Sequence, residues 1–308
     1  MNYPVIRICI PTLNPHIDDL IKTKMQIPTE VLGYKTEISI VDSGSRNIDE
    51  IRNIFEDVIQ IDKSSFNHGA TRNLIALRAP SKILVFLTQD ALVLSKSFLE
   101  NLIKPIILND AAATYGRQLP REDASLLETF SRYFNYPDHD IIKNASSIED
   151  LGVKAFFYSN VCSAIDTEIF KDLGGFPEDV IMNEDMVLAV KVISAGYNIK
   201  YVHLAEVIHS HEYSLLQQFK RNFDVGTFFA DNTARLPAVS VEGEGVKFLK
   251  RQMRYVISHG KTSLIPLVFL EAFAKLSGYQ LGKRHRILPK SFKVYASMHS
   301  YHWNKSKE

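Results

Sequence analysis

Short apolar runs alternate with segments of helical period through the first half of the chain. The apolar runs predict strands at Val5–Ile10, Glu37–Val41, Val58–Ile61, Lys82–Leu87 and Ala111–Gly116. The periodic segments predict helices at Ile48–Phe55, Gly69–Ala79 and Ser97–Ile107. Strands separated by helices form βαβ crossovers, so the pattern predicts an α/β fold with a mostly parallel central sheet.

The second half of the chain is less regular. Helices are predicted at Asp166–Leu173 and Glu184–Ala195, and each is followed by a glycine that favours a stop. Two short edge strands are predicted at Lys200–Val202 and Glu206–Ile208. One further helix face would contain Leu215, Leu216, Phe219, Phe223 and Phe229. Residues 236–245 are typical of a linker, so we expect a domain over residues 1–235 and a helical, basic extension over 236–308.

The composition indicates a globular protein. Of the 308 residues 45% are apolar and 23% are charged, which is ordinary for a folded chain. The N-terminus has no basic region before its apolar run and does not read as a signal peptide. The apolar stretch Leu264–Leu281 contains Glu271 and Lys275, so we do not predict a membrane span there. Cys9 and Cys162 lie in strand-like runs and are expected to be buried free thiols, as in a cytoplasmic protein.

The charge is divided unevenly along the chain. Residues 246–308 contain 13 Lys and Arg but only two acids, Glu271 and Glu308, although the whole chain has 36 bases and 35 acids. Nine aromatic residues are interleaved with these bases. Such a segment suits an anionic membrane surface and predicts a peripheral location on the inner face of the cytoplasmic membrane. The alternative is that these bases form a solvent-exposed helix face, whose positive charge is balanced by the excess of acids in residues 1–245. We expect no nucleic-acid partner.

Polar clusters follow three of the predicted strands, at Pro11–Asn14, Asp42–Ser45 and Thr88–Asp90. Open α/β sheets bind ligands at the carboxyl ends of their strands. Asp42 could accept hydrogen bonds from a ribose or a base, or it could form an Asx turn. Asp90 follows a fully apolar strand; it is a candidate ligand of Mg²⁺ or Mn²⁺ or, alternatively, a turn residue.

Three further groups carry candidate chemistry. The predicted helix start at Gly69, with Arg72, could form an anion site for a diphosphate, or it could be an ordinary capped helix. Glu184 and Asp185 could supply a general base, although acids also favour helix starts electrostatically. His209 and His211 alternate along an extended segment, so both could face a metal or a diphosphate.

In this order the motifs resemble glycosyltransferase family 2, the inverting enzymes with the GT-A nucleotide-sugar-binding fold. The resemblance rests on Pro-Thr-Leu-Asn at 11–14, Val-Asp-Ser-Gly-Ser at 41–45, the acidic turn near residue 90, Glu-Asp at 184–185 and Gln-x-x-Arg at 218–221. Longer strings resemble bacterial rhamnosyltransferases, namely residues 66–73, 87–91, 115–121 and 219–224. This resemblance implies transfer of L-rhamnose from dTDP-L-rhamnose to a lipid-linked glycan in cell-surface polysaccharide synthesis.

The resemblance also implies roles for single residues. Asp185 would be the base with Glu184 beside it, and Asp90 would bind Mg²⁺ or Mn²⁺ with help from His211 or His209. The donor-binding set would be Pro11, Thr12, Asn14, Asp42, Ser43, Gly69, Arg72, Gln89, Gln218 and Arg221. The chain departs from the family twice, because Thr88 replaces the first acid of Asp-x-Asp and Asn222 replaces a tryptophan.

Other functions stay open at this point. The donor could be a UDP- or GDP-sugar, and the loss of one acid leaves room for an inactive scaffold that binds a nucleotide sugar. A nucleotidyltransferase would need a Gly-rich or Lys-bearing triphosphate loop, which Pro11–Asn14 does not offer. A homo-oligomer is possible.

Overall fold

The computed structural model describes residues 4–237 and 242–304. The chain divides into two compact units. The first contains residues 4–122, 135–178 and 184–210, and the second contains 123–134, 179–183 and the described residues from 211 onward. Residues 238–241 of the expected linker lie outside the described residues. A domain boundary after residue 235 stays a prediction.

The first unit holds a ten-stranded sheet in the order β2-β3-β1-β5-β9-β7-β10-β6, with β4 paired to β3 and β8 paired to β10. The strands are β1 (Val5–Thr12), β2 (Glu30–Val31), β3 (Tyr34–Asp42), β4 (Asp57–Gln60), β5 (Ile83–Leu87), β6 (Leu92–Val93), β7 (Ala113–Leu119), β8 (Ile141–Lys143), β9 (Cys162–Asp166) and β10 (Ile199–Ile208). All five strands predicted in the first half of the chain are present.

The sheet is mixed. Strand β1 pairs in parallel with β3 and β5, β3 with β4, and β7 with β10. Strand β9 runs antiparallel to both β5 and β7 and lies between them, so these two strands still point the same way. The two predicted edge strands are wrong. They form the single strand β10, which is paired on both sides and changes register between Val202 and Glu206.

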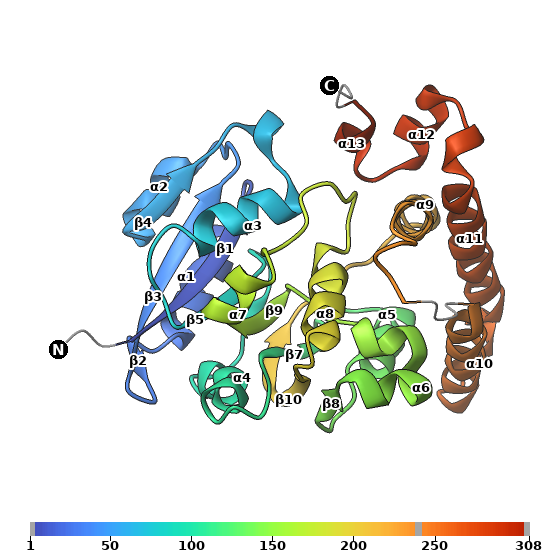
Figure 1. The fold of residues 1–308 in the computed structure, drawn as a ribbon. Helices are drawn as coiled ribbons and strands as arrows, with labels where there is room; N and C mark the ends of the chain where they lie inside the picture. The colour runs from blue at the N-terminus through green and yellow to red at the C-terminus, as the bar shows by residue number, and fades with distance from the viewer. Residues whose placement is uncertain (1–3, 238–241, 305–308) are drawn as a thin grey trace. The chain divides into compact units, whose positions relative to one another are not determined.

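Helices cover both faces of this sheet (Figure 1). They are α1 (Ile17–Gln26), α2 (Ile48–Ile54), α3 (His68–Ala76), α4 (Phe98–Ile107), α6 (Ile148–Leu151), α7 (Thr167–Asp172) and α8 (Glu184–Ser194). Short 3₁₀ turns occur at Lys63–Ser65, Ala145–Ser147 and Gly152–Phe156. The predicted helices are confirmed within a few residues, whereas the pattern did not single out α1 or α6.

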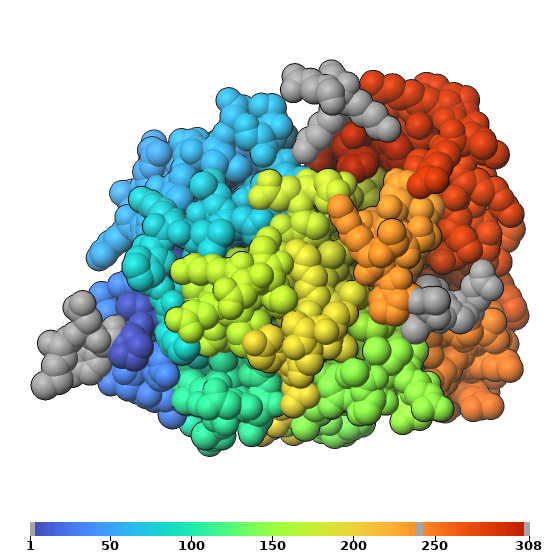
Figure 2. All heavy atoms as spheres, in the orientation of Figure 1, coloured from blue at the N-terminus to red at the C-terminus, as the bar shows by residue number. Residues whose placement is uncertain are grey.

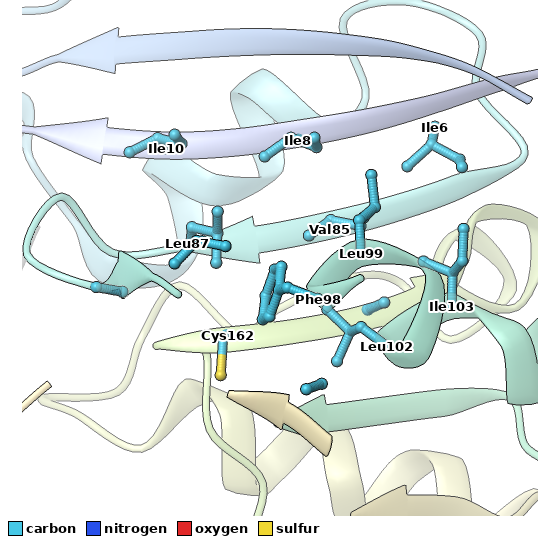
Figure 3. Packing of buried hydrophobic residues seen from close by; sticks show 14 of the residues in the cluster. Ile6, Ile8, Ile10, Val85, Leu87, Phe98, Leu99, Leu102, Ile103 and Cys162 are labelled. Atoms are coloured by element: carbon cyan, nitrogen blue, oxygen red, sulfur yellow. The ribbon is translucent and has the colours of Figure 1, made fainter. Parts of the chain in front are cut away.

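Strand alternation produces the two buried faces. Ile6, Ile8 and Ile10 point to one side of β1 and belong to a core that includes the α4 residues Phe98 and Leu102, as Figure 3 shows. On the other side, Phe86 contacts Phe170 of α7 and Phe176 at ring separations of 5.9 and 5.0 Å. Cys9 and Cys162 are buried free thiols, as predicted. Both faces of the sheet are thus covered by buried apolar side chains.

The second unit is helical. It contains α5 (Leu126–Asn135), α9 (Leu215–Asp231), α10 (Glu242–Ser258), α11 (Ile265–Lys283), α12 (Lys290–Ala296) and α13 (Ser300–Asn304), with 3₁₀ turns at Thr262–Leu264 and His285–Ile287. The predicted helical extension is therefore confirmed. The predicted apolar face of α9 is partly wrong. Phe223 is buried as predicted, but Leu215 and Leu216 are exposed, and Phe228, which was not predicted, is fully buried.

Helices α9 and α11 approach each other at glycines. A Cβ atom added to Gly278 would lie 2.2 Å from the carbonyl oxygen of Phe219, and one added to Gly282 would lie 2.0 Å from that of Phe223. Gly226 of α9 meets the carbonyl oxygen of Tyr279 in the same way, at 2.2 Å. Any side chain at these positions would push the two helices apart.

Within the described residues, Thr262–Lys283 is one helical stretch whose length and composition would suffice to cross a membrane.

Candidate active site

The polar ends of several strands meet at one edge of the sheet. Strands β1, β3, β5, β7 and β10 all point the same way, so their carboxyl ends lie at the same edge. Thr12 at the end of β1 is in register with Asp42 at the end of β3. Strand β9 begins at this edge, opposite the last residue of β5. The candidate residues after these strands are therefore neighbours.

Asp42 is fully buried and organises the turn that follows β3. One carboxylate oxygen accepts hydrogen bonds from the backbone N–H groups of Gly44, at 3.0 Å, and Ser45, at 2.8 Å. The other oxygen accepts from the hydroxyl groups of Thr12, at 3.0 Å, and Ser45. These four donors occupy the four acceptor sites of a carboxylate. The contacts therefore show the Asx-type role of Asp42, and a nucleoside contact stays a prediction.

The loop after β1 is held by Gln89. Its side chain accepts from the Leu13 N–H group at 2.7 Å and donates to the Leu13 carbonyl oxygen at 3.2 Å. The next residue, Asn14, has a left-handed backbone with φ of 46° and donates its N–H group to the Ser45 hydroxyl at 2.6 Å. Gln89 thus fixes the shape of the loop. Among the described residues the buried hydroxyl of Ser43 has no hydrogen-bond partner.

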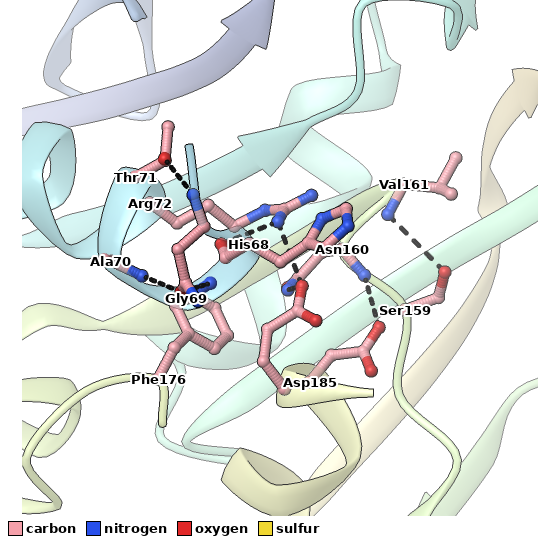
Figure 4. Close-up of polar contacts among 12 residues, drawn as sticks. His68, Gly69, Ala70, Thr71, Arg72, Ser159, Asn160, Val161, Phe176 and Asp185 are labelled. Carbon is pink, nitrogen blue, oxygen red and sulfur yellow. Dashed lines mark hydrogen bonds and ion pairs between the residues drawn. The ribbon is translucent and has the colours of Figure 1, made fainter. Parts of the chain in front are cut away.

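The acid pair at the start of α8 is bound to Asn160, two residues before β9. The backbone N–H group of Asn160 donates to Asp185 at 3.3 Å, and its side-chain amide donates to Glu184 at 3.2 Å. Asp185 also accepts from the N–H group of Met186 at 2.8 Å. The neighbouring Val161 carbonyl oxygen accepts from Thr88 at 3.1 Å, so this loop adjoins the end of β5. Figure 4 shows Asn160 beside Asp185.

Arg72 forms a buried ion pair with Glu184. One guanidinium nitrogen donates to the Glu184 carboxylate and to the His68 carbonyl oxygen, both at 2.9 Å (Figure 4). Both side chains of the ion pair are only 7% exposed. The N–H groups of Gly69 and Ala70 donate to the Asn67 side chain that caps α3. The contacts therefore support a role for Arg72 in holding Glu184, and its contact with a diphosphate stays a prediction.

Gly69 has a packing role. A Cβ atom at this position would lie 2.0 Å from the Pro177 carbonyl oxygen. Glycine thus lets the first turn of α3 touch the segment that leads to the acid pair. Asn67 strengthens this contact by donating its side-chain amide to the Glu178 carbonyl oxygen at 2.8 Å. Binding of a donor by Gly69 itself is not tested by these contacts.

The two adjacent acids have opposite pKa shifts. Burial alone would raise the pKa of Glu184, but the Arg72 guanidinium, His68 and the hydrogen bonds to the carboxylate together outweigh it, and the net shift is downward. Burial and the negative charge of Glu184 raise the pKa of Asp185 to about 7. Burial lowers the pKa of His68, which faces both Glu184 and Arg72, so this imidazole is neutral at pH 7. Asp185 is thus a carboxyl that can take and release a proton near neutral pH.

Asp90 lies beside His209 at the same edge. A carboxylate oxygen of Asp90 is 3.5 Å from Nε2 of His209, and Nδ1 of His209 is 2.9 Å from the side-chain oxygen of Gln118. The amide of Gln118 in turn donates to Ser159 at 2.9 Å, which fixes its oxygen toward the histidine. With Nδ1 protonated, Nε2 keeps a lone pair on the side of Asp90. This carboxylate and imidazole pair fits a divalent cation.

The remaining candidates belong to the second unit. His211 begins the long C-terminal part of the second unit. It follows His209 by two positions, so the two histidines are close along the backbone. Its N–H group donates to Glu128 at 3.4 Å. Gln218 and Arg221 lie on α9. Gln218 is half-buried, while Arg221 is exposed and lies 5.8 Å from the Tyr213 ring centre.

Sequence reasoning missed Asn160 and Gln118. Asn160 belongs to no motif, and Gln118 lies in the string 115–121 without an assigned role. Each lies far along the chain from the residue that it binds. Asn160 lies two residues before a strand, and by residue type it is indistinguishable from an ordinary turn asparagine. Gln118 lies within β7 and would be read as an ordinary strand residue. Only the pairing of β7 with β10 brings Gln118 next to the segment of His209.

Comparison with known proteins gives consistent matches. The family model described as Glycosyl transferase family 2 matches residues 8–174. The chain is 37% identical to the O-antigen chain rhamnosyltransferase RfbN of Salmonella typhimurium over 97% of this chain and 96% of that protein. It is 40% identical to the O-antigen chain rhamnosyltransferase WbaN of Salmonella anatum over 87% of this chain and 86% of that protein.

Solved structures share the fold at low identity. The mannosyltransferase PcManGT of Pyrobaculum calidifontis, in complex with GDP-Man and Mn²⁺, gives a TM-score of 0.56 at 17% identity, over 98% of this chain and 85% of that one. S. aureus TarS 1-349 in complex with UDP-GlcNAc gives 0.52 at 15% identity, over 91% of each chain. Both likenesses show the same chain fold.

Proposed function

The chain belongs to glycosyl transferase family 2, and we propose that it transfers L-rhamnose from dTDP-L-rhamnose to a glycan in the synthesis of a bacterial cell-surface polysaccharide such as O-antigen. It is a glycosyltransferase with the expected GT-A fold. Two matched relatives are O-antigen chain rhamnosyltransferases, and one of them aligns over nearly its full length, which supports rhamnose as the sugar.

The observation that carries the proposal is the position and pKa of Asp185. Its carboxylate is half-buried, is oriented by the N–H groups of Asn160 and Met186, and has a pKa raised to about 7. In the proposed reaction Asp185 takes the proton of the acceptor hydroxyl. That oxygen forms a bond to the anomeric carbon while the bond from this carbon to the diphosphate breaks, and dTDP leaves with the bonding electrons. Attack from the opposite side converts a β-linked donor into an α-L-rhamnoside.

Glu184 and Arg72 position the base. The buried ion pair keeps Glu184 ionised, and this negative charge beside Asp185 favours the protonated form of the base at the end of the step. The hydrogen bond to the His68 carbonyl oxygen holds the Arg72 guanidinium within α3, and the bond to Glu184 joins α3 to the first turn of α8. We therefore propose that Arg72 acts through Glu184.

A set of loop residues shapes the donor side of the sheet edge, namely Pro11, Thr12, Asn14, Asp42, Ser43 and Gln89.

We propose that Asp90, His209 and His211 hold a divalent cation, since each can offer one ligand atom. A bound cation would neutralise charge on the donor diphosphate. Imidazole nitrogen is a poor ligand for Mg²⁺, which requires oxygen in a strict octahedral arrangement, so this donor set favours Mn²⁺. Gln118 contacts Nδ1 of His209 at 2.9 Å and would thereby leave Nε2 to bind the cation. This arrangement would compensate for Thr88 at the place of the first acid of Asp-x-Asp.

The acceptor and the location form a further part of the proposal. We propose a lipid-linked glycan acceptor, with the enzyme bound peripherally to the inner face of the cytoplasmic membrane by its basic extension, residues 236–308. The excess of bases from residue 246 onward supports this location. Gln218 and Arg221 would lie on the path of donor or acceptor, and a homo-oligomer remains compatible with this function.

The test is binding and hydrolysis of the donor across a panel of dTDP-, UDP- and GDP-sugars, with Mn²⁺, with Mg²⁺ and after chelation. We expect dTDP-L-rhamnose to bind best and to require a cation, with Mn²⁺ more effective than Mg²⁺. Asp90→Asn should weaken Mn²⁺ binding, measured by calorimetry without donor. A preference for a UDP- or GDP-sugar would refute the rhamnosyl assignment, and equal donor binding after chelation would refute the metal site.

A further inference from the structure

The outward side of α11 exposes a row of large apolar side chains. Phe269, Leu270, Phe273 and Leu276 are 50%, 53%, 72% and 60% exposed, and we call these four residues the outer face of α11. Their spacing of one, three and four residues places them on one side of a helix. Single exposed apolar residues are common, but four adjacent ones on one helix face indicate an interaction surface. Figure 2 shows the helices of this unit from α9 onward in orange to red.

The opposite side of α11 is firmly packed. Gly278 and Gly282 lie against the backbone of α9, and Val268 is fully buried with Leu127 and Val256. The two charges within the apolar stretch, Glu271 and Lys275, pair with each other at 3.4 Å. These contacts fix which side of α11 is turned outward. The helix therefore presents its outer face without further rearrangement.

The surroundings of the outer face are mainly basic, although Arg286 pairs with Asp231 of α9 at 3.0 Å. Exposed bases lie at both ends of α11, with Lys261 before it and Lys283, Arg284 and Arg286 after it. The described residues 246–304 include one acid, Glu271, and it is already paired. Two copies of this surface would bring like charges together, whereas an anionic surface would attract them. Charge complementarity thus favours a lipid surface over a second copy of the chain.

The packing of α11 against α9 also decides whether α11 would span a bilayer or lie along its surface. Helix α9 carries Lys220, Arg221, Asp224 and Asp231, and these charges would be costly in hydrocarbon. Because the glycine contacts lock α11 to α9, α11 cannot enter the bilayer alone as a spanning helix. A helix with one apolar side and basic ends instead lies in the plane of the interface.

We propose that the outer face of α11 inserts into the acyl boundary of an anionic lipid leaflet, with α11 parallel to the membrane plane and its basic ends on the headgroups. This deepens the peripheral location given above and rests on it for its biological role. The insertion itself depends only on the second unit. At about 1.5 Å per residue, the 19 residues of α11 would give a contact about 28 Å long.

The first experiment measures binding of the full chain to phosphatidylcholine vesicles with and without phosphatidylglycerol. We expect strong binding only to the anionic vesicles. The double variant Phe269→Ser, Phe273→Ser should bind about a hundredfold more weakly, since each aromatic side chain contributes about tenfold on burial. The matched control Leu108→Ser removes an equally exposed apolar residue from the first unit, where Leu108 is 58% exposed, and should bind like the parent.

A second experiment locates the insertion directly. Trp303 is the only tryptophan, so Phe273→Trp in a Trp303→Phe background gives a single reporter on the outer face. Its fluorescence should shift to the blue on anionic vesicles and should be quenched by lipids brominated near the headgroup. Leu108→Trp in the same background should show neither effect.

Three outcomes would overturn the proposal. These are unchanged vesicle binding of the double variant, a bound Phe273→Trp reporter that brominated lipids do not quench, and a dimer in sedimentation that the double variant dissociates without any change in vesicle binding. The last result would assign the outer face to self-association. Donor binding, measured on the same samples, reports on the proposed function separately, because its failure would leave the vesicle results unchanged.

Discussion

Two aspartates, one in each unit, show how the same chemical group is put to different uses. Burial raises the pKa of Asp185 to about 7, together with the charge of Glu184, and burial raises the pKa of Asp224 to about 6. Both accept two backbone hydrogen bonds. For Asp224 these come from Met298 at 2.8 Å and His299 at 3.3 Å.

The difference lies in exposure and in the neighbouring groups. Asp224 is fully buried on α9, and its hydrogen bonds tether the segment that leads into α13. Asp185 is only half-buried at the edge of the sheet, and a second carboxylate lies beside it in the chain. A raised pKa alone therefore does not mark a catalytic base. A carboxyl must also be reachable by a substrate and have a neighbour that sets its charge.

The largest effect is expected from Asp185→Asn. The amide keeps the shape of the side chain but cannot accept the proton, so kcat/KM for rhamnose transfer should fall by about 10²–10⁴-fold. Donor affinity, measured by calorimetry, should change little. Retained turnover would remove Asp185 from the role of base and would make it comparable to Asp224.

The same variant should also change stability with pH. The folded-state pKa of Asp185, about 7, lies above the ordinary value of 3.8, so folding favours the protonated form. This contribution is fully present below about pH 4 and is lost as the pH rises to about 7, so above that pH the ionised side chain opposes folding. Asp185→Asn should therefore raise Tm at pH 8 relative to the parent. A lower Tm at pH 8 would contradict the assigned shift.

Arg72→Met should have the next largest effect. It leaves the Glu184 carboxylate buried without its cation, which costs about 3–5 kcal/mol of the free energy of unfolding, measured with urea. The double variant Arg72→Met, Glu184→Gln should recover part of that stability because no buried charge remains. If both variants were equally unstable, the loss would come from packing of the Arg72 side chain.

Asp224→Ala should act on structure alone. Loss of its two backbone hydrogen bonds should speed amide hydrogen exchange at Met298 and His299 by about tenfold, equivalent to roughly 1–2 kcal/mol. The value of kcat per folded molecule should stay the same. A drop in kcat comparable to that of Asp185→Asn would show that the two aspartates do not differ as described.

The smallest expected effect is a shift of the pH profile. The base must be ionised, so kcat/KM should rise with pH and level off above about pH 7. Glu184→Gln removes a negative neighbour that raises the pKa of Asp185, so the rising limb should move to lower pH. An unchanged profile in this variant would mean that burial alone sets the pKa of Asp185.

The sequence by itself determined the strands of the parallel part of the sheet, the helices between them and the polar clusters at their ends. These features depend on local period and on breakers such as Pro11 and Gly196, which act within a few residues. The motifs also sufficed for the family, since Asp42, Asp90 and the acid pair occur in the family's order. The basic extension could be read from charge alone.

Only the tertiary structure decided the features that depend on contacts between residues far apart in the sequence. Strand β9 inserts antiparallel between β5 and β7, and it carries Asn160 to the acid pair, 24 residues away along the chain. Arg72 meets Glu184 across 112 residues, an ion pair that neither residue's place in the sequence reveals. The pKa of Asp185 and the outward side of α11 have the same origin, because burial is a property of packing and cannot be read from the residue type.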